Sequence, residues 1–115
     1  MEIVRHEAGP RMSQAVVHGS TVYLAGQVAQ DASQGVTGQT AQVLAEIDRL
    51  LALAGSHKSK ILSAQVFLAN MGTFAEMNAA WDAWVDKGNT PARATLETRL
   101  AGPQYLVEIM VVAAR

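Results

Sequence analysis

Residues 91–115 read PARATLETRLAGPQYLVEIMVVAAR, and they decide how the sheet of this protein is built. Two runs rich in strand-forming residues, 93–100 and 105–113, predict two β-strands joined through Ala101-Gly102-Pro103. Each run carries a charge that a strand does not need: Arg93 opens the first, and Glu108 lies in the otherwise apolar second. Burying an unpaired charge costs free energy. These two positions are therefore candidates for function.

Working outward, residues 60–70 (KILSAQVFLAN) are apolar on both sides and predict a central strand. Two shorter runs, 15–18 and 21–27, predict a hairpin that turns at Gly19-Ser20, and the polar stretch 31–38 predicts a loop. Apolar residues recur at helical spacing from Thr40 to Ala54, with Gly55 at the C-terminal end. A second helix is expected from the capping-box pattern at residues 73–76 to Gly88-Asn89.

The order strand, strand, helix, strand, helix, strand, strand predicts one α+β domain over residues 1–115. Its two helices are expected on one face of a mixed or antiparallel sheet. The strands at 60–70 and 105–113 are apolar on both faces, yet two helices can cover only one face. An uncovered apolar sheet face is typical of a protein–protein surface. The pattern therefore predicts a homo-oligomer.

Bulk composition excludes several classes of function. The net charge is −1 and the cationic side chains are scattered, which argues against nucleic-acid binding. No cysteine is present, so disulfides and thiolate nucleophiles are excluded. His6, His18 and His57 are isolated, so we expect no metal site. The N-terminal stretch lacks signal-peptide character, and no apolar run reaches the roughly 20 residues of a membrane span, so we expect a soluble cytoplasmic protein.

Alternation along a strand places Arg93 and Thr95 on one face. If a tight turn joins the last two strands as a hairpin, Thr95 lies opposite Glu108 and Arg93 lies diagonal to it. That register predicts a guanidinium, a hydroxyl and a carboxylate on one face. The pair is then either a structural ion pair or a small-anion site, in which Arg93 binds a carboxylate and Glu108 activates water or transfers a proton.

Several stretches together resemble the RidA family, also called YjgF or L-PSP. They are TVYLAGQ (21–27), LLALAG (50–55), VFLANMGTFAEMNAAW (66–81), PAR (91–93) and VEI (107–109). The most specific feature is PAR followed fifteen residues later by the glutamate of VEI. Their order and spacing cover nearly the whole chain, from about residue 11 to residue 114.

The resemblance implies a chorismate mutase-like α+β fold, with about five to six mixed strands and two helices on one face. It also implies a homotrimer whose clefts lie between subunits. Family members hydrolyse reactive enamine and imine intermediates of the 2-aminoacrylate type to 2-keto acids and ammonia, without a cofactor. By resemblance, the chain is a deaminase acting on compounds such as 2-iminobutanoate and 2-iminopropanoate.

Residue by residue, Arg93 matches the family arginine that holds the substrate carboxylate, and Glu108 matches the glutamate that positions and activates water. Gly26 matches a glycine whose backbone lines the pocket. Thr95 falls where many members have a small polar or thiol side chain. Tyr105 lies beside the expected turn and is a candidate for the border of an intersubunit cleft.

Three departures from the family pattern change the expected pocket. Met12 lies in the N-terminal region where many members carry a tyrosine, Thr95 replaces a common thiol, and Met110 stands where a second acidic residue is frequent. A less polar pocket favours larger or more apolar imines. Two other functions stay open: a non-catalytic trimer that binds small carboxylates or acts as a chaperone, and an endoribonuclease of the L-PSP type.

Overall fold

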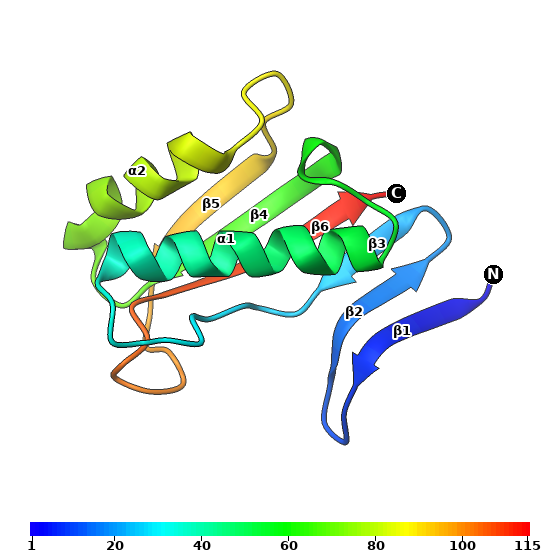
Figure 1. Cartoon of the computed structure of the whole chain (residues 1–115), viewed down its shortest axis with the longest axis horizontal. Helices are drawn as coiled ribbons and strands as arrows, with labels where there is room; N and C mark the ends of the chain where they lie inside the picture. The colour runs from blue at the N-terminus through cyan, green and yellow to red at the C-terminus, as the bar shows by residue number, and fades with distance from the viewer.

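One mixed six-stranded sheet carries two helices on a single face (Figure 1). The computed structural model describes residues 1–115 throughout. Its strands and α-helices, in chain order, are β1 (Ile3–Ala8), β2 (Ser13–His18), β3 (Thr21–Leu24), α1 (Val36–Leu53), β4 (Ile61–Leu68), α2 (Phe74–Trp84), β5 (Ala92–Glu97) and β6 (Val107–Ala114). The strand order across the sheet is β1-β2-β3-β6-β4-β5, and β4–β5 is the parallel pair.

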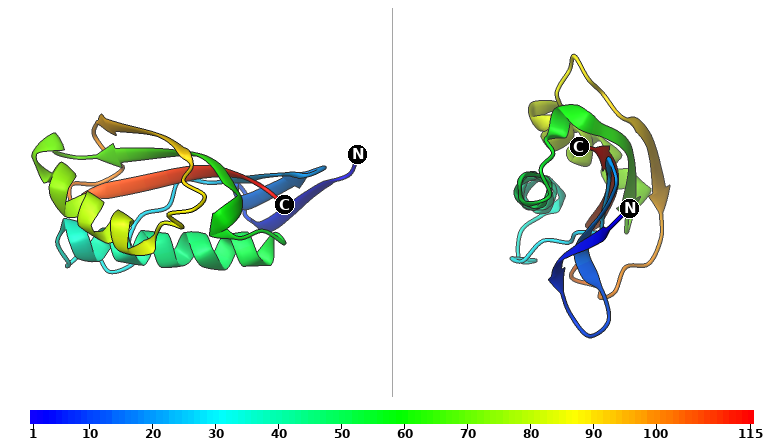
Figure 2. Two further views of the ribbon diagram at one scale, coloured as in Figure 1. Left: turned by 90° about the horizontal axis from the view of Figure 1, so that it is seen from above. Right: turned by 90° about the vertical axis from the view of Figure 1, so that its right-hand side faces the viewer.

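The core lies between the helices and one face of the sheet, as the view from above shows (Figure 2). Helix α1 buries an apolar stripe that includes Val43, Ile47, Leu50 and Leu51. Each such side chain removed from water contributes about 1.5–3 kcal/mol. The predicted α+β class, with both helices on one face, is confirmed.

The N-terminal hairpin turns where predicted, and a further strand, β1, pairs with its first strand. Residues His18 and Thr21 pair across Gly19-Ser20, and Gly19 takes φ +61°, a conformation that a glycine adopts without strain. Strand β1 was not predicted, because its sequence IVRHEA carries three charged or titratable residues in succession. It lies at the sheet edge and pairs only with β2, where such residues are tolerated.

Both helices have boundaries that differ from the predicted ones. Helix α1 begins at Val36, so the expected loop 31–38 is too long. The buried Gln39 side chain explains this, because its Nε2 donates to the carbonyls of Ala32, Gln34 and Gln104 and its Oε1 accepts from the Leu106 amide. Tertiary hydrogen bonds thus fix the first turn of the helix despite its polar sequence.

Helix α2 starts where predicted but ends at Trp84, four residues before Gly88. The capping box does not form. The Thr73 hydroxyl donates to the Asn70 carbonyl and gives no cap hydrogen bond. A short 3-10 turn, η2 (Met71–Thr73), leads into the helix, and the Asn70 side chain accepts from the Gly72 amide.

The predicted hairpin between the last two strands is wrong. Strand β4 lies between β5 and β6, so that Val66 pairs with Thr95 on one side and with Ile109 on the other. Strands β4 and β5 are parallel because α2 connects them as a crossover helix. Residues 98–106 therefore form a loop that passes the end of β4, where the Ala69 amide donates to the Leu106 carbonyl.

The sheet face opposite the helices is uncovered and partly apolar. Tyr23 and Met110 alternate with core residues along β3 and β6, and Leu96 of β5 is level with Phe67; the three side chains are 48%, 37% and 45% exposed. This is the uncovered face that the strand pattern predicted. Neither helix of the chain is long and apolar enough to cross a membrane.

Candidate active site

Arg93 lies on edge strand β5 with its side chain against helix α2. Its Nη1 donates to Asn78 Oδ1 at 2.8 Å. The guanidinium carbon lies 4.9 Å from the Trp81 ring centroid and 5.9 Å from the Phe74 ring centroid. Residues 74, 78 and 81 share one helical face, so a single stripe of α2 holds the cation.

The charge of Arg93 is not neutralised by any carboxylate of its own chain. The only ion pairs of the chain involve Arg49. Partial burial lowers the pKa of the Arg93 guanidinium, and the charge of Asp82 partly opposes this shift. An arginine nevertheless stays protonated at neutral pH. Because Nε and Nη2 make no hydrogen bond within the chain, they remain free to bind an anion.

Glu108 lies on β6 next to Gly26. A β-carbon added at Gly26 would collide with the Glu108 carboxylate in its present position, so the glycine lets this carboxylate lie against the backbone. The bridge between Gln27 and Ile109 holds the two segments together through hydrogen bonds in both directions. Across the sheet, Glu108 is level with Phe67 of β4. The structure thus brings together two of the five predicted site residues.

Arg93 and Glu108 lie on opposite faces of the sheet. Arg93 is level with Ala64, which is buried under the helices, whereas Glu108 is level with Phe67, one position out of phase with the buried Val66. The expectation of one face that carries guanidinium, hydroxyl and carboxylate together is therefore wrong. A single chain cannot bring these two side chains to one small molecule.

The two remaining predicted residues are Thr95, on strand β5, and Tyr105, in the loop before β6. Thr95 shares the helix-covered face with Arg93, since it is level with the buried Val66. Tyr105 belongs to the loop 98–106 and lines a hollow of about 580 Å³ together with Glu97 and Arg99. Its amide donates to the Gly102 carbonyl.

Asn78, Trp81 and Phe74 hold Arg93 and were not predicted as site residues. The apolar stripe of α2 was recognised, but the polar residue inside it was not. An asparagine among apolar side chains at helical spacing is the signal that could have indicated it. No group of three or more histidine, aspartate or glutamate side chains is arranged to hold a metal ion.

Comparison with known proteins extends the resemblance to the whole chain. A family model described as Endoribonuclease L-PSP matches residues 3–115. The chain belongs to the RidA/YjgF/L-PSP family. A RutC family protein from Haemophilus ducreyi is 47% identical over 112 residues, 97% of this chain and 96% of the relative. The RutC family protein YoaB from Escherichia coli is 47% identical over 114 residues, 99% of each chain.

A crystal structure of a YjgF family member from Neisseria meningitidis superposes with a TM-score of 0.95. The two chains are 46% identical, and the match covers 100% of this chain and 96% of the other. The strand order and crossover described above are thus those of a RidA/YjgF chain.

Proposed function

We propose that this RidA/YjgF protein hydrolyses reactive imines and enamines of the 2-aminoacrylate type to 2-keto acids and ammonia. The reaction would take place in clefts between the subunits of a homotrimer, without a cofactor. The observation that carries the proposal is the half-buried guanidinium of Arg93, which has free N–H donors and no carboxylate partner. Such a group is suited to bind a substrate carboxylate, at about 1.5–3 kcal/mol for each charge-assisted hydrogen bond.

The opposite faces of Arg93 and Glu108 make the proposed site a composite of two chains. One protomer contributes Arg93 and Thr95, and its neighbour contributes Glu108 and Gly26. Tyr105 borders the cleft from the loop 98–106. The uncovered sheet face, with its exposed Tyr23 and Met110, supports an assembly in which one subunit's sheet meets another's.

In the proposed reaction, Arg93 holds the carboxylate of the imine, and a water molecule lies between Glu108 and the imine carbon. Glu108 accepts a proton from the water as the water oxygen bonds to the carbon of the protonated imine, which gives a neutral carbinolamine. Glu108 returns this proton to the nitrogen, and the C–N bond breaks as the hydroxyl oxygen forms the carbonyl of the 2-keto acid. The departing ammonia takes up the hydroxyl proton and leaves as ammonium. Water is the only co-reactant, and Glu108 ends in its starting state.

The surroundings of Glu108 support a preference for larger or more apolar imines. Phe67 is level with it on β4, and Met110 follows it on the same face of β6. The N-terminal loop carries Met12, which is 50% exposed, in the region where the family resemblance places a tyrosine in many members. A pocket lined in this way would remove more apolar surface from water with a longer substrate side chain.

Mixing two inactive variants tests both the activity and the composite site. A pyridoxal-phosphate dehydratase generates the imine, and the disappearance of the imine is followed in the presence of the protein. Arg93→Ala and Glu108→Gln are each expected to lose activity by at least about a hundredfold. Co-refolded at equal amounts, the two variants should recover roughly a quarter of wild-type activity, because mixed trimers then contain intact sites.

No recovery on mixing would refute the two-chain site. Equal imine loss with wild type and with Arg93→Ala would refute the deaminase assignment itself. The Glu108→Gln variant also separates the deaminase from a protein that only binds carboxylates, because it should keep binding 2-oxobutanoate while turnover falls. Cleavage of RNA by nuclease-free protein would instead favour the endoribonuclease named by the family model, although the net charge of −1 argues against it.

A further inference from the structure

The largest hollow of the chain contains none of the residues of the proposed active site. Its volume is about 690 Å³, and helix α1, the N-terminal hairpin and the segment 27–30 form its walls. Seven of its nine lining residues are polar, and four of them are glutamines, namely Gln14, Gln27, Gln30 and Gln42. Gln27 pairs through its backbone with the buried Ile109, so this groove lies on the helix-covered side of the sheet, behind Glu108.

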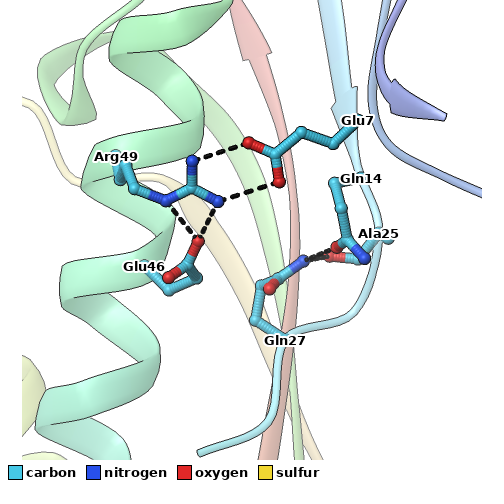
Figure 3. A network of polar contacts seen from close by, with 6 residues as sticks. All are labelled: Glu7, Gln14, Ala25, Gln27, Glu46 and Arg49. Atoms are coloured by element: carbon cyan, nitrogen blue, oxygen red, sulfur yellow. Dashed lines mark hydrogen bonds and ion pairs between the residues drawn. The ribbon is translucent and has the colours of Figure 1, made fainter. Parts of the chain in front are cut away.

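The orientation of the Gln27 side chain is fixed, and it leaves one oxygen without a partner. Its Nε2 donates to the Ala25 carbonyl and to Gln14 Oε1, both at 2.9 Å (Figure 3). Because a carbonyl oxygen can only accept, Nε2 must face Ala25, and Oε1 must face away from it. The residue is only 8% exposed. Since no fully enclosed side-chain oxygen of the chain lacks a hydrogen bond, Gln27 Oε1 opens to the groove.

The groove has an excess of negative charge. Arg49 binds Glu7 through Nη1 and Nη2, at 2.6 and 3.0 Å, and binds Glu46 Oε1 through Nε at 2.6 Å (Figure 3). Two carboxylates and one guanidinium leave one net negative charge. Glu46 Oε2 accepts no hydrogen bond from the chain. Both the free oxygens and the charge thus favour a ligand that is cationic and rich in N–H donors.

One residue in the wall of the groove, Glu7, has a strained backbone conformation. Glu7 takes φ +51°, a conformation that residues with a β-carbon rarely adopt. It is skipped in the pairing of β1 with β2, where His6 pairs with Ala15 and Ala8 with Ser13. The register is the same on both sides of Glu7, and its carboxylate is directed towards Arg49 of α1. Strained residues of this kind are concentrated at functional sites.

We propose that this groove binds a small organic cation that carries N–H donors, such as a guanidinium compound, through Gln27 Oε1 and Glu46 Oε2. The two oxygens accept N–H hydrogen bonds, and the net negative charge supplies the attraction for a cation. This site is separate from the guanidinium of Arg93, which is proposed to bind a carboxylate. One chain would therefore bind an anionic ligand at one place and a cationic ligand at another.

Nuclear magnetic resonance of the full ¹⁵N-labelled protein tests the proposal at constant ionic strength. Methylguanidinium has both charge and N–H donors, tetramethylammonium has charge alone, and N-methylurea has N–H donors alone. We expect the side-chain amide signals of Gln27 and Gln14 to shift saturably with methylguanidinium at millimolar concentrations. Neither of the other two compounds should produce saturable shifts.

A pair of matched variants locates the binding. Glu46→Gln removes the charge from the groove and should weaken methylguanidinium binding about tenfold. Glu76→Gln makes the same change on the exposed side of α2 and should leave the affinity unchanged. Absence of saturable shifts with methylguanidinium, or equal weakening by both variants, overturns the proposal. Equal binding of tetramethylammonium or N-methylurea also overturns it, since then N–H donors or charge would not be required.

Discussion

Two arginines of this chain, Arg49 and Arg93, have opposite surroundings. Arg49 lies on the outside of α1 and is about half exposed, and it binds two carboxylates through three of its nitrogens. Arg93 lies half-buried between the sheet edge and two aromatic rings, and its one hydrogen bond to an oxygen goes to a neutral amide. The more buried cation is therefore the one without an anionic partner.

This contrast distinguishes a structural arginine from a candidate binding arginine. The carboxylates of Glu7 and Glu46 raise the pKa of Arg49 and leave its charge satisfied, whereas burial lowers the pKa of Arg93. A buried charge without a counterion is costly to the folded state. The chain retains this cost at Arg93, as expected if an external anion completes the site.

Among changes that keep both arginines, giving Arg93 the kind of partner that Arg49 has should produce the largest effect. Asn78→Asp places a carboxylate at the position of the amide that now accepts from Nη1 at 2.8 Å. The internal ion pair should compete with the substrate carboxylate and weaken the binding of 2-oxobutanoate, measured by calorimetry, on the order of tenfold to a hundredfold.

Lys60→Gln serves as the control for Asn78→Asp, because it lowers the net charge by the same unit at an exposed position before β4. It should leave the affinity for 2-oxobutanoate almost unchanged. If Asn78→Asp binds 2-oxobutanoate as tightly as the wild type does, Arg93 is not the carboxylate-binding group.

A smaller effect is expected when a ring beside Arg93 is removed. Phe74 is 41% exposed, so Phe74→Leu changes the surroundings of the guanidinium with little damage to the core. A cation–π contact at such a position is worth about 0.5–1 kcal/mol, so KM for the imine should rise about two- to fivefold with little change in kcat. Phe74→Tyr keeps the ring and should retain the wild-type KM. Equal KM values for the two variants would show that the ring does not position Arg93.

Much of the fold was predictable because it depends on local patterns. The apolar stripe of α1, the two-sided apolar run of β4 and the turn at Gly19-Ser20 each appear within a short stretch of sequence, and all three are present in the structure. The position of β5 was not predictable in this way. A turn after Leu100 looks local, but the crossover through α2 decides which strand β5 pairs with.

In the candidate site too, residue identities could be predicted from the sequence, whereas their spatial arrangement could not. Arg93, Glu108 and Gly26 could be selected from residue type and family resemblance, and the contact of Gly26 with Glu108 is present. Their placement on opposite faces depends on β4 lying between β5 and β6, which an alternation pattern cannot reveal. The role of Asn78 depends on tertiary structure, since only the fold places α2 against the start of β5.

The two arginines should also differ in their effect on stability. Arg49→Met leaves Glu7 and Glu46 without a cation and should lower Tm by about 1–3 °C. Arg93→Met removes a half-buried cation that has no counterion and keeps apolar contact with the rings, so Tm should rise by about 1–3 °C. Thermal unfolding followed by circular dichroism measures both. A similar decrease for both variants would mean that Arg93 is as structural as Arg49.

The smallest expected effect is the pH dependence of the Glu7 contact. The hydrogen bond from Arg49, assisted by the nearby charge of Arg49 and of His6, holds the pKa of Glu7 below its usual range. A carboxyl group whose folded-state pKa is depressed stabilises the fold above the unfolded pKa and loses this contribution as the pH falls through the folded value. Glu7→Gln should therefore unfold about 1 °C below wild type near pH 7, and this difference should shrink as the pH falls through the folded-state pKa of Glu7. Glu2→Gln, at an exposed position without an ion pair, should follow the wild type at every pH. A difference between wild type and Glu7→Gln that does not shrink as the pH falls would mean that shape and hydrogen bonding around residue 7, and not the charge of Glu7, hold the hairpin against α1.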